Sequence, residues 1–237
     1  MKNKFGFILV KTQLGENIGA CARSMKNFGF SKLHIVSPKI NFPNHKTKAT
    51  SVGAYDIINK AKVFDNVEKA IEPFNLVIAL SARRRDINKR HISLNNFQNI
   101  IKKRQNLNIG FMFGPEASGL SNQDLSFSNY IMQIPTTTKF KSLNLSHSLT
   151  VICYEIFKLI NQNKTKNNNL NLKISSKGKI ADLVRHLTSL LEKKDFFTPK
   201  EKKHSMLLNI NNLFYKLQPN DKELRILASI ISSLSRK

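Results

Sequence analysis

Short apolar runs alternate with helix-periodic segments through the first 160 residues, and this alternation restricts the fold more than any other feature of the chain. Two intervening segments, 17–28 and 145–160, place apolar residues at helical spacing, and Asn17 is a suitable cap for the first of them. The runs that are typical of buried strands span 5–10, 32–36, 76–80, 109–113 and 130–134. The pattern predicts an α/β fold with a mainly parallel sheet.

The last third of the chain changes character. Residues 161–178 are polar and rich in Asn and Lys, which is typical of a flexible linker. Residues 179–237 carry three apolar stripes at helical spacing, so we expect a small all-α extension. The predicted organisation is therefore an α/β domain over 1–160, a linker over 161–178 and a helical extension over 179–237.

The chain is strongly basic, with 39 Lys and Arg against 15 Asp and Glu and a net charge of +24. Residues 161–237 alone hold 16 basic and 6 acidic residues. Neutralisation of phosphates drives binding to nucleic acids, so the charge favours an RNA or DNA partner. A Lys-rich composition inherited from an AT-rich genome is the alternative explanation.

Several classes of protein are disfavoured by composition. No run of 18 or more apolar residues is present, and the short run at 5–10 reads as a strand rather than a signal peptide, so we expect a cytoplasmic protein without membrane spans. Cys21 and Cys153 both fall on expected helices and are interpreted as reduced core thiols. The six His show no metal-ligand spacing, so no metal site is expected.

Polar residues follow three of the apolar segments. They lie in the stretches 17–23 (Asn-Ile-Gly-Ala-Cys-Ala-Arg), 113–120 (Phe-Gly-Pro-Glu-Ala-Ser-Gly-Leu) and 134–146, which begins Ile-Pro and ends Ser-Leu-Asn-Leu-Ser. Parallel sheets bind ligands in the crevice outside the carboxyl ends of their strands. We therefore expect these three stretches to form one site.

Each stretch also has a simpler interpretation. The glycines at 114 and 119 fit a tight turn, and the absence of a Gly-Lys-Ser or Gly-Lys-Thr ending disfavours NTP hydrolysis. The polar residues at 142–146 fit helix caps, although three in five residues exceed what one cap needs. Arg23 could be a solvated helix residue, and the arginines at 83–85 either contact phosphates or lie in a solvated loop.

In this order the three stretches resemble the motifs of the TrmH-type SPOUT RNA 2'-O-ribose methyltransferases, over residues 5–160. The run Ser81-Ala-Arg-Arg-Arg-Asp86 and the C-terminal helical extension indicate the TrmJ-like branch. Members of that branch methylate the ribose 2'-hydroxyl of the pyrimidine at position 32 of the tRNA anticodon loop. The resemblance implies a SPOUT-type sheet tied in a C-terminal trefoil knot, a homodimer with active sites shared between subunits, and S-adenosylmethionine as methyl donor.

The resemblance also implies roles for individual residues. Those expected at the cofactor are Ala79, Leu80, Ser81, Gly114, Ile134, Ser142 and Leu143. Those expected in catalysis are Arg23, Glu116, Ser142 and Asn144. Those expected to contact RNA are Asn17, Arg23, Arg83, Arg84 and Arg85. In this interpretation Arg23 reaches the substrate ribose and phosphate from the partner subunit, and Asn17 supports it. The pKa of a guanidinium, above about 12, makes it a poor base, so a positioning role for Arg23 is easier to defend than proton abstraction.

Other functions remain open at this stage. The nearest alternative is a ribosomal RNA methyltransferase of the same family. A non-catalytic RNA-binding knot protein would keep the scaffold and the charge but would not need the whole set of polar residues. A small-molecule or nucleotide-binding protein would leave the charge unexplained. The sequence predicts that the Lys-rich extension binds tRNA, but it does not decide between cytidine and uridine or show how the extension docks.

Overall fold

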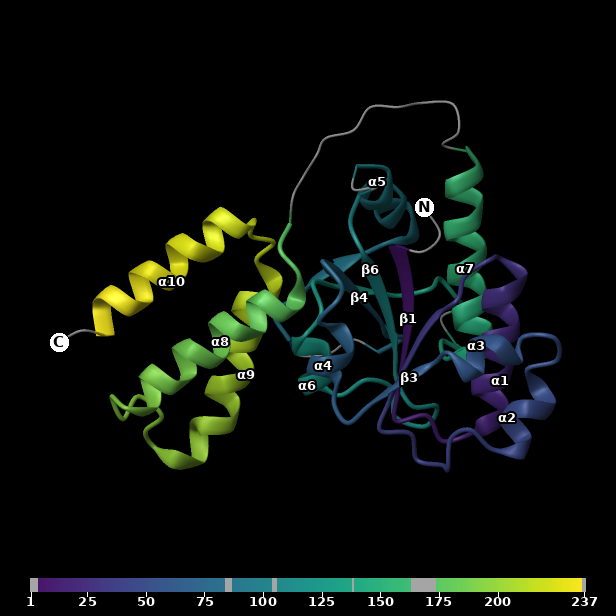
Figure 1. The fold of residues 1–237 in the computed structure, drawn as a ribbon, viewed down its shortest axis with the longest axis horizontal. Helices are drawn as coiled ribbons and strands as arrows, with labels where there is room; N and C mark the ends of the chain where they lie inside the picture. The colour runs from purple at the N-terminus through teal and green to yellow at the C-terminus, as the bar shows by residue number, and fades with distance from the viewer. Residues whose placement is uncertain (1–3, 84–86, 104–105, 138, 163–173, 236–237) are drawn as a thin grey trace.

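The computed structural model describes residues 4–83, 87–103, 106–137, 139–162 and 174–235. Seven strands form one sheet in the order β3-β2-β1-β6-β4-β7-β5, and each neighbouring pair is parallel (Figure 1). The strands are β1 (Phe5–Val10), β2 (Lys32–Val36), β3 (Lys62–Phe64), β4 (Leu76–Leu80), β5 (Arg90–Ile92), β6 (Ile109–Phe113) and β7 (Tyr130–Met132). The predicted α/β fold with a mainly parallel sheet is confirmed.

Helices cover both faces of this sheet (Figure 1). One face packs against α1 (Gly15–Asn27), α3 (Tyr55–Asn59), α5 (Leu94–Lys103) and α7 (Leu145–Gln162), and α2 (His45–Thr50) packs on α1. The other face packs against α4 (Val67–Ile71) and α6 (Asn122–Ser126). Outside them, α8 (Lys177–Glu192) contacts α4, α9 (Lys203–Lys216) contacts α6 and α8, and α10 (Asp221–Ser235) contacts α8.

Side-chain alternation along the strands creates two separate cores. In β1, Phe5, Phe7 and Leu9 enter the cluster under α1 and α7, while Ile8 and Val10 enter the cluster on the opposite face. Successive side chains of a strand point to opposite faces of its sheet, and here both faces are buried. This double burial explains why the strands read as continuous apolar runs rather than as alternating ones.

Some local predictions differ from the structure. Helix α1 begins at Gly15, two residues before Asn17, and its cap residue Leu14 makes no side-chain cap hydrogen bond. Asn17 is therefore not the cap and is free to bond elsewhere. Three elements, α3, α6 and β5, were not predicted, because spans of three to five residues are too short to show a periodicity.

The C-terminal helices α8, α9 and α10, which we call the tail, contribute side chains to the apolar cluster on the second side of the sheet. Ile180, Ala181 and Val184 of α8 and Phe214 of α9 are buried in the same cluster as β4 and α4. Residues 163–173 of the predicted linker lie outside the described residues, so the linker and the domain boundaries stay predictions. The trefoil knot also stays a prediction.

Two buried lysines and one asparagine attach α9 to α8 and to the segments before β5 and β7. The Nζ of Lys89 donates hydrogen bonds to the carbonyls of Ser126 and Ser128 at 2.8 Å each and to that of Asn212 at 3.3 Å. The carbonyl of Tyr215 accepts hydrogen bonds from Lys177 Nζ at 3.1 Å and from Asn129 Nδ2 at 2.9 Å. Each Lys Nζ thus donates to backbone carbonyls near a helix end, where carbonyls lack partners within the helix and a cation interacts favourably with the helix dipole.

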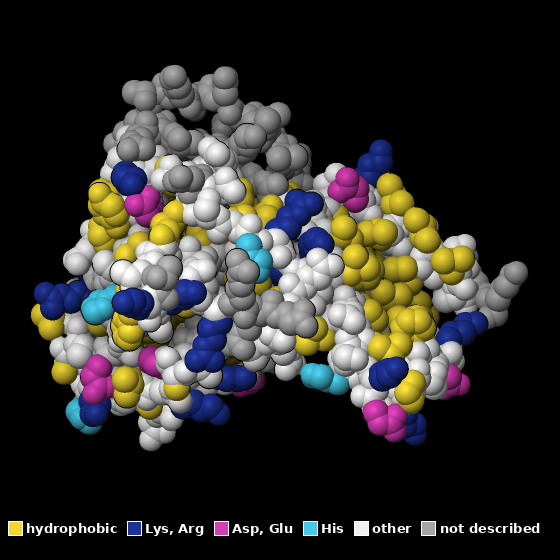
Figure 2. Space-filling model, turned by 180° about the vertical axis from the view of Figure 1, so that it is seen from behind, with side chains coloured by type: hydrophobic (Ala, Val, Ile, Leu, Met, Phe, Trp, Pro, Cys, Tyr) yellow, Lys and Arg dark blue, Asp and Glu magenta, His cyan; other side chains and the backbone are white. Residues whose placement is uncertain are grey.

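The outer side of the tail is apolar in part. Figure 2 shows hydrophobic side chains gathered over it, and its exposed large side chains include Leu213, Leu217, Ile226, Ile230 and Leu234. None of the helices in the described part of the chain combines the length and apolar character that a membrane span requires.

Candidate active site

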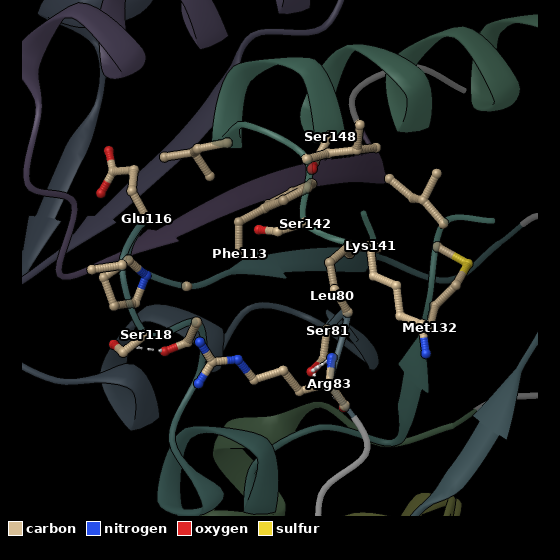
Figure 3. Close-up of a pocket in the computed structure, with 18 residues that line it drawn as sticks. Leu80, Ser81, Arg83, Phe113, Glu116, Ser118, Met132, Lys141, Ser142 and Ser148 are labelled. Carbon is tan, nitrogen blue, oxygen red and sulfur yellow. Dashed lines mark hydrogen bonds between the residues drawn. The ribbon is translucent and has the colours of Figure 1, made fainter. Parts of the chain in front are cut away.

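A pocket lies outside the carboxyl ends of β4, β6 and β7, where the sequence places its polar stretches. Its lining comes from the segments 80–83, 113–119 and 141–148, together with Met132 and Ile134. Figure 3 shows Glu116 at one end of the pocket and Met132 with Lys141 at the other, while Arg83 reaches toward Ser118. The pocket therefore joins apolar side chains to hydroxyls and to three charged groups, Arg83, Glu116 and Lys141.

A chain of hydrogen bonds ties the three polar stretches together. Asn17 Nδ2 on α1 donates to Glu116 Oε1 at 2.7 Å, and the backbone N–H of Gln13 donates to Glu116 Oε2 at 3.0 Å. Asn144 Nδ2 donates to Asn17 Oδ1 at 3.1 Å. Both carboxylate oxygens of Glu116 are thus engaged, and the arrangement fixes α1 against the pocket loop and against the start of α7.

Asn144 has a second role at the start of α7. Its Oδ1 accepts hydrogen bonds from the backbone N–H of Ser146 at 2.8 Å and from the hydroxyl of Ser146 at 2.7 Å. This is the geometry of a helix cap, which satisfies orphan N–H groups of the first turn. The cap interpretation and the site interpretation of this stretch are therefore both correct, since one amide group serves both.

Two glycines allow the pocket loop between β6 and α6 to close on itself. Gly119 adopts a φ of 68°, and its N–H donates to the Pro115 carbonyl at 2.8 Å. A Cβ on Gly114 would lie 2.3 Å from the backbone N of Leu120, a distance that the loop could not accommodate without shifting. The loop thus depends on glycine at both ends.

Most residues expected at the cofactor line this pocket. They are Leu80, Ser81, Gly114, Ile134, Ser142 and Leu143, and Glu116 and Arg83 lie beside them. Ala79 does not line it, because it lies within β4, level with Met112 and Ile131, and is fully buried.

The remaining expected residues lie around the pocket. Asn17 and Asn144 belong to the hydrogen-bond chain behind it. Arg23 is exposed on α1 and is not among the lining residues. Arg84 and Arg85 lie outside the described residues.

Several lining residues were not predicted. Lys141, Ser118 and Ser148 are among them, and Lys141 stands directly before Ser142 in the sequence. Its position next to Ser142, a predicted cofactor residue, could have indicated that it lines the pocket. In a chain with so many Lys, however, a single Lys is a weak indicator of a site. Lys141 makes the pocket more basic than the sequence suggested.

The two thiols are buried and do not line the pocket. Cys21 and Cys153 are free and buried, and burial raises the pKa of both thiols far above the ordinary value. They are therefore inert at neutral pH. Among the described residues, no group of three or more His, Cys, Asp or Glu could hold a metal ion.

Comparisons with known proteins agree with this geometry. The sequence model of the SpoU rRNA Methylase family matches residues 4–154. The tRNA (cytidine/uridine-2'-O-)-methyltransferase TrmJ of Pectobacterium atrosepticum is 30% identical over 244 residues, which cover 100% of this chain and 98% of the relative. The tRNA (cytidine-2'-O-)-methyltransferase TrmJ of Methanocaldococcus jannaschii is 33% identical over 199 residues, which cover 83% of this chain and 84% of the relative.

A solved structure extends the likeness to the whole fold. The crystal structure of TrmJ from Z. mobilis ZM4 has a TM-score of 0.88 and 29% sequence identity, and the match covers 98% of this chain and 99% of that one. The coverage includes the tail as well as the sheet. The chain therefore belongs to the SpoU rRNA methylase family of SPOUT methyltransferases, in its TrmJ-like branch.

Proposed function

We propose that this protein is an S-adenosylmethionine-dependent tRNA 2'-O-ribose methyltransferase that acts in the cytoplasm on the pyrimidine at position 32 of the anticodon loop. One observation carries the proposal: two of the three polar stretches line one pocket, and Asn17 of the third stretch joins them behind it through the hydrogen bonds Asn144–Asn17–Glu116. The names of the full-length relatives support the same reaction and a tRNA substrate.

The pocket lining fits S-adenosylmethionine. The apolar side chains of Leu80, Ile134 and Leu143 suit an adenine ring, while the hydroxyls of Ser81 and Ser142 suit a ribose. When bound, the cofactor supplies an electrophilic sulfonium methyl group. The residues around it then need only exclude water and hold the methyl carbon in line with the 2'-oxygen, which is catalysis by positioning.

Glu116 and Asn144 act in this proposal by holding the site together. Each oxygen of Glu116 already accepts a hydrogen bond, at 2.7 and 3.0 Å, so the carboxylate is poorly placed to take a proton from RNA. Asn144 joins the cap of α7 to Asn17. Their role is to fix the pocket loop and the Ser142 backbone, while Ser142 itself faces the ligand.

Arg23 is the cation that we assign to the substrate ribose and its phosphate. It is exposed on α1 and lies outside the lining of its own pocket, which supports its action in the pocket of a second subunit. The helices α1 and α7 also present an aromatic group, Phe28 with Tyr154 and Phe157, with ring centroids 6.2 and 5.7 Å from Phe28. Tyr154 is half exposed, and such a face suits a homodimer interface.

The tail is assigned to RNA affinity through its exposed lysines. Lys193, Lys200 and Lys202 are exposed and lie on the connection between α8 and α9. Phosphate contacts of this kind raise affinity without reading sequence. In this proposal residues 1–160 carry the chemistry, and residues 179–237 add binding energy.

The test is methyl transfer from labelled S-adenosylmethionine to unmodified tRNA transcripts, with nucleoside analysis of the product. We expect a 2'-O-methylated cytidine or uridine that maps to position 32. Label in ribosomal RNA alone would keep the chemistry and contradict the substrate. Absence of transfer to any RNA, with no cofactor binding in calorimetry, would contradict the enzyme activity itself.

A further inference from the structure

Phe140 is the most exposed aromatic side chain of the described residues, and it directly precedes Lys141, which lines the pocket. It lies in the loop between β7 and α7, and 77% of its surface is accessible to solvent. The loop is held by its own hydrogen bonds, from the Phe140 N–H to Thr137 Oγ1 and from Thr136 Oγ1 to the Lys141 carbonyl, both at 3.3 Å. The backbone at Phe140 and Lys141 is therefore tied to Thr137 and Thr136, while the ring is exposed to solvent.

This exposure is unusual within the chain. All 16 Phe lie in the described residues, and only Phe140 and Phe196 are exposed. Phe196 contacts the ring of Phe197, with centroids 5.4 Å apart, whereas within the described part of the chain Phe140 belongs to neither apolar cluster and has no ring partner. A single exposed apolar side chain is ordinary on a protein surface. This ring, however, stands between two lysines and directly before the pocket-lining Lys141, and that combination suits contact with a ligand.

The surroundings of the ring are basic. Lys139 and Lys141 flank Phe140 in the sequence, and Lys141 also lines the pocket, as Arg83 does. The sequence contains no acidic residue between Asp124 and Glu155. A partner for this loop must therefore combine an apolar face with negative charge.

Unpaired RNA has this combination. Its bases stack on aromatic side chains while its phosphates bind Lys and Arg, and recognition of single-stranded loops by proteins commonly uses both contacts. An acidic protein could match the charge but would not need an isolated ring. A second subunit of the same chain would bring its own basic residues to an already basic loop.

We propose that Phe140 is a base-stacking residue for the substrate RNA, with Lys139 and Lys141 binding the phosphates on either side of the stacked base. The inference rests on the proposed function, since it takes RNA as the substrate. It adds an RNA contact from the subunit that holds the cofactor, beside Arg23 from the other subunit. Stacking of this kind does not read a base sequence, so it adds affinity and orientation.

The absence of Trp from the chain allows a direct test. Phe140→Trp would place the only tryptophan, which can be excited selectively over the four Tyr, at the stacking position while keeping an aromatic face. We expect an unmodified tRNA transcript to quench its emission and S-adenosylhomocysteine alone to leave it unchanged. Quenching by S-adenosylhomocysteine alone would overturn the proposal, because the ring would then cover the adenine of the cofactor. No quenching by tRNA, at concentrations at which the variant binds it, would also overturn it.

Two further variants separate stacking from general apolar packing. Phe140→Leu keeps apolar volume and loses the aromatic face, while Phe140→Ala loses both. We expect each to weaken tRNA binding by roughly tenfold, and Phe140→Trp to bind tRNA as the unchanged protein does. The dissociation constant for S-adenosylmethionine and the dimer mass in light scattering should not change. Full tRNA affinity in Phe140→Leu, or dissociation of the dimer, would contradict a stacking role.

These measurements remain informative if the proposed reaction fails. Binding and quenching need no turnover, so a chain that binds tRNA without methylating it would still show whether Phe140 stacks on a base. If the unchanged protein methylates tRNA and Phe140→Ala binds and reacts normally, the stacking inference alone is wrong.

Discussion

Basic side chains at the pocket differ in exposure and in bonding from the two lysines that lie against α9. Arg83 and Lys141 line the pocket and are exposed, with no ion pair among the described residues. Lys89 and Lys177 are buried, and each donates to backbone carbonyls of α9 or of the segment after α6. The exposed pair is available to a ligand, whereas the buried pair is used to hold two parts of the chain together.

The comparison changes how the net charge is interpreted. A net charge of +24 favours a nucleic-acid partner, but part of it lies where no RNA can reach. A buried ammonium without a carboxylate is normally costly, and here carbonyl dipoles replace water. Only exposed cations, such as Arg23 on α1, Arg83 and Lys141 at the pocket and the lysines between α8 and α9, can therefore contribute to RNA affinity.

The largest effect is expected at the cation that we assign to the substrate. Arg23→Ala removes the group that orients the ribose and its phosphate, and misplacement of a reacting group costs on the order of a hundredfold in rate. We expect kcat/KM for methyl transfer to fall by about that factor, with the melting temperature and the oligomeric state unchanged. The matched control is Lys26→Ala, which removes another exposed cation of α1, one that pairs with Asp56 at 2.7 Å. Equal losses in both variants would show that only the charge of α1 matters.

A smaller effect is expected where the hydrogen-bond chain supports the pocket. Asn144→Asp keeps the oxygen that caps α7 and removes the N–H₂ donor to Asn17, so the two roles of this residue separate. We expect stability near that of the unchanged protein and roughly tenfold slower methyl transfer, since displacement of the pocket loop misaligns the methyl group. Asn144→Ala should add a loss of about 1 kcal/mol in unfolding free energy, because the cap is removed too. Full activity in Asn144→Asp would show that the link to Asn17 is dispensable.

The strands of the sheet were predictable from the sequence, whereas the contact between Asn17 and Glu116 was not. The strands and their polar ends were predictable because double burial makes the strands continuously apolar, as at 76–80 and 109–113. The bond from Asn17 to Glu116 joins residues 99 apart in sequence, and a cap was the simpler local explanation for Asn17. No local pattern encodes such a contact.

Side-chain direction explains another difference. Ala79 was expected at the cofactor together with Leu80 and Ser81, yet neighbouring residues of a strand face opposite sides, and Ala79 lies in the core cluster under the tail. The stripes of the tail predicted its helices correctly. They did not show that these stripes join the apolar cluster on the second side of the sheet, because amphipathicity indicates burial without naming the partner.

A loss of RNA affinity is expected when the exposed lysines between α8 and α9 are removed. Replacing Lys193, Lys200 and Lys202 with Ala removes three exposed cations without uncovering the core cluster, as deletion of the tail would. We expect roughly tenfold weaker tRNA binding at low salt and a shallower dependence of affinity on salt, by about 0.9 for each phosphate that the variant no longer neutralises. Cofactor affinity, measured in the same samples by calorimetry, should not change. An unchanged salt dependence would restrict RNA binding to the body of the protein.

The smallest effect, and the most specific to the buried pair, concerns pH. Burial lowers the pKa of Lys89 to about 7, and the pKa of Lys177 is lowered by burial and by Lys89. Between pH 7 and the ordinary value for Lys, about 10.4, the unfolded chain therefore binds more protons than the folded one, and stability rises with pH. The gain from Lys89 between pH 7 and 8 should be about 1 kcal/mol in unfolding free energy.

Other titrating groups make pH 7 to 8 the range in which the effect of Lys89 on stability is best measured. His34, whose pKa burial also lowers, is neutral in both states above pH 7 and contributes little there. The raised pKa values of Cys21 and Cys153 act in the opposite direction once the unfolded thiols ionise, near pH 8.5. Denaturant unfolding at pH 7 and pH 8 should show the rise, and Lys89→Met should reduce it while Lys26→Ala leaves it intact. A rise of the same size in Lys89→Met would mean that Lys89 is not the group that titrates, and the contrast between exposed and buried cations would then rest on hydrogen bonding alone.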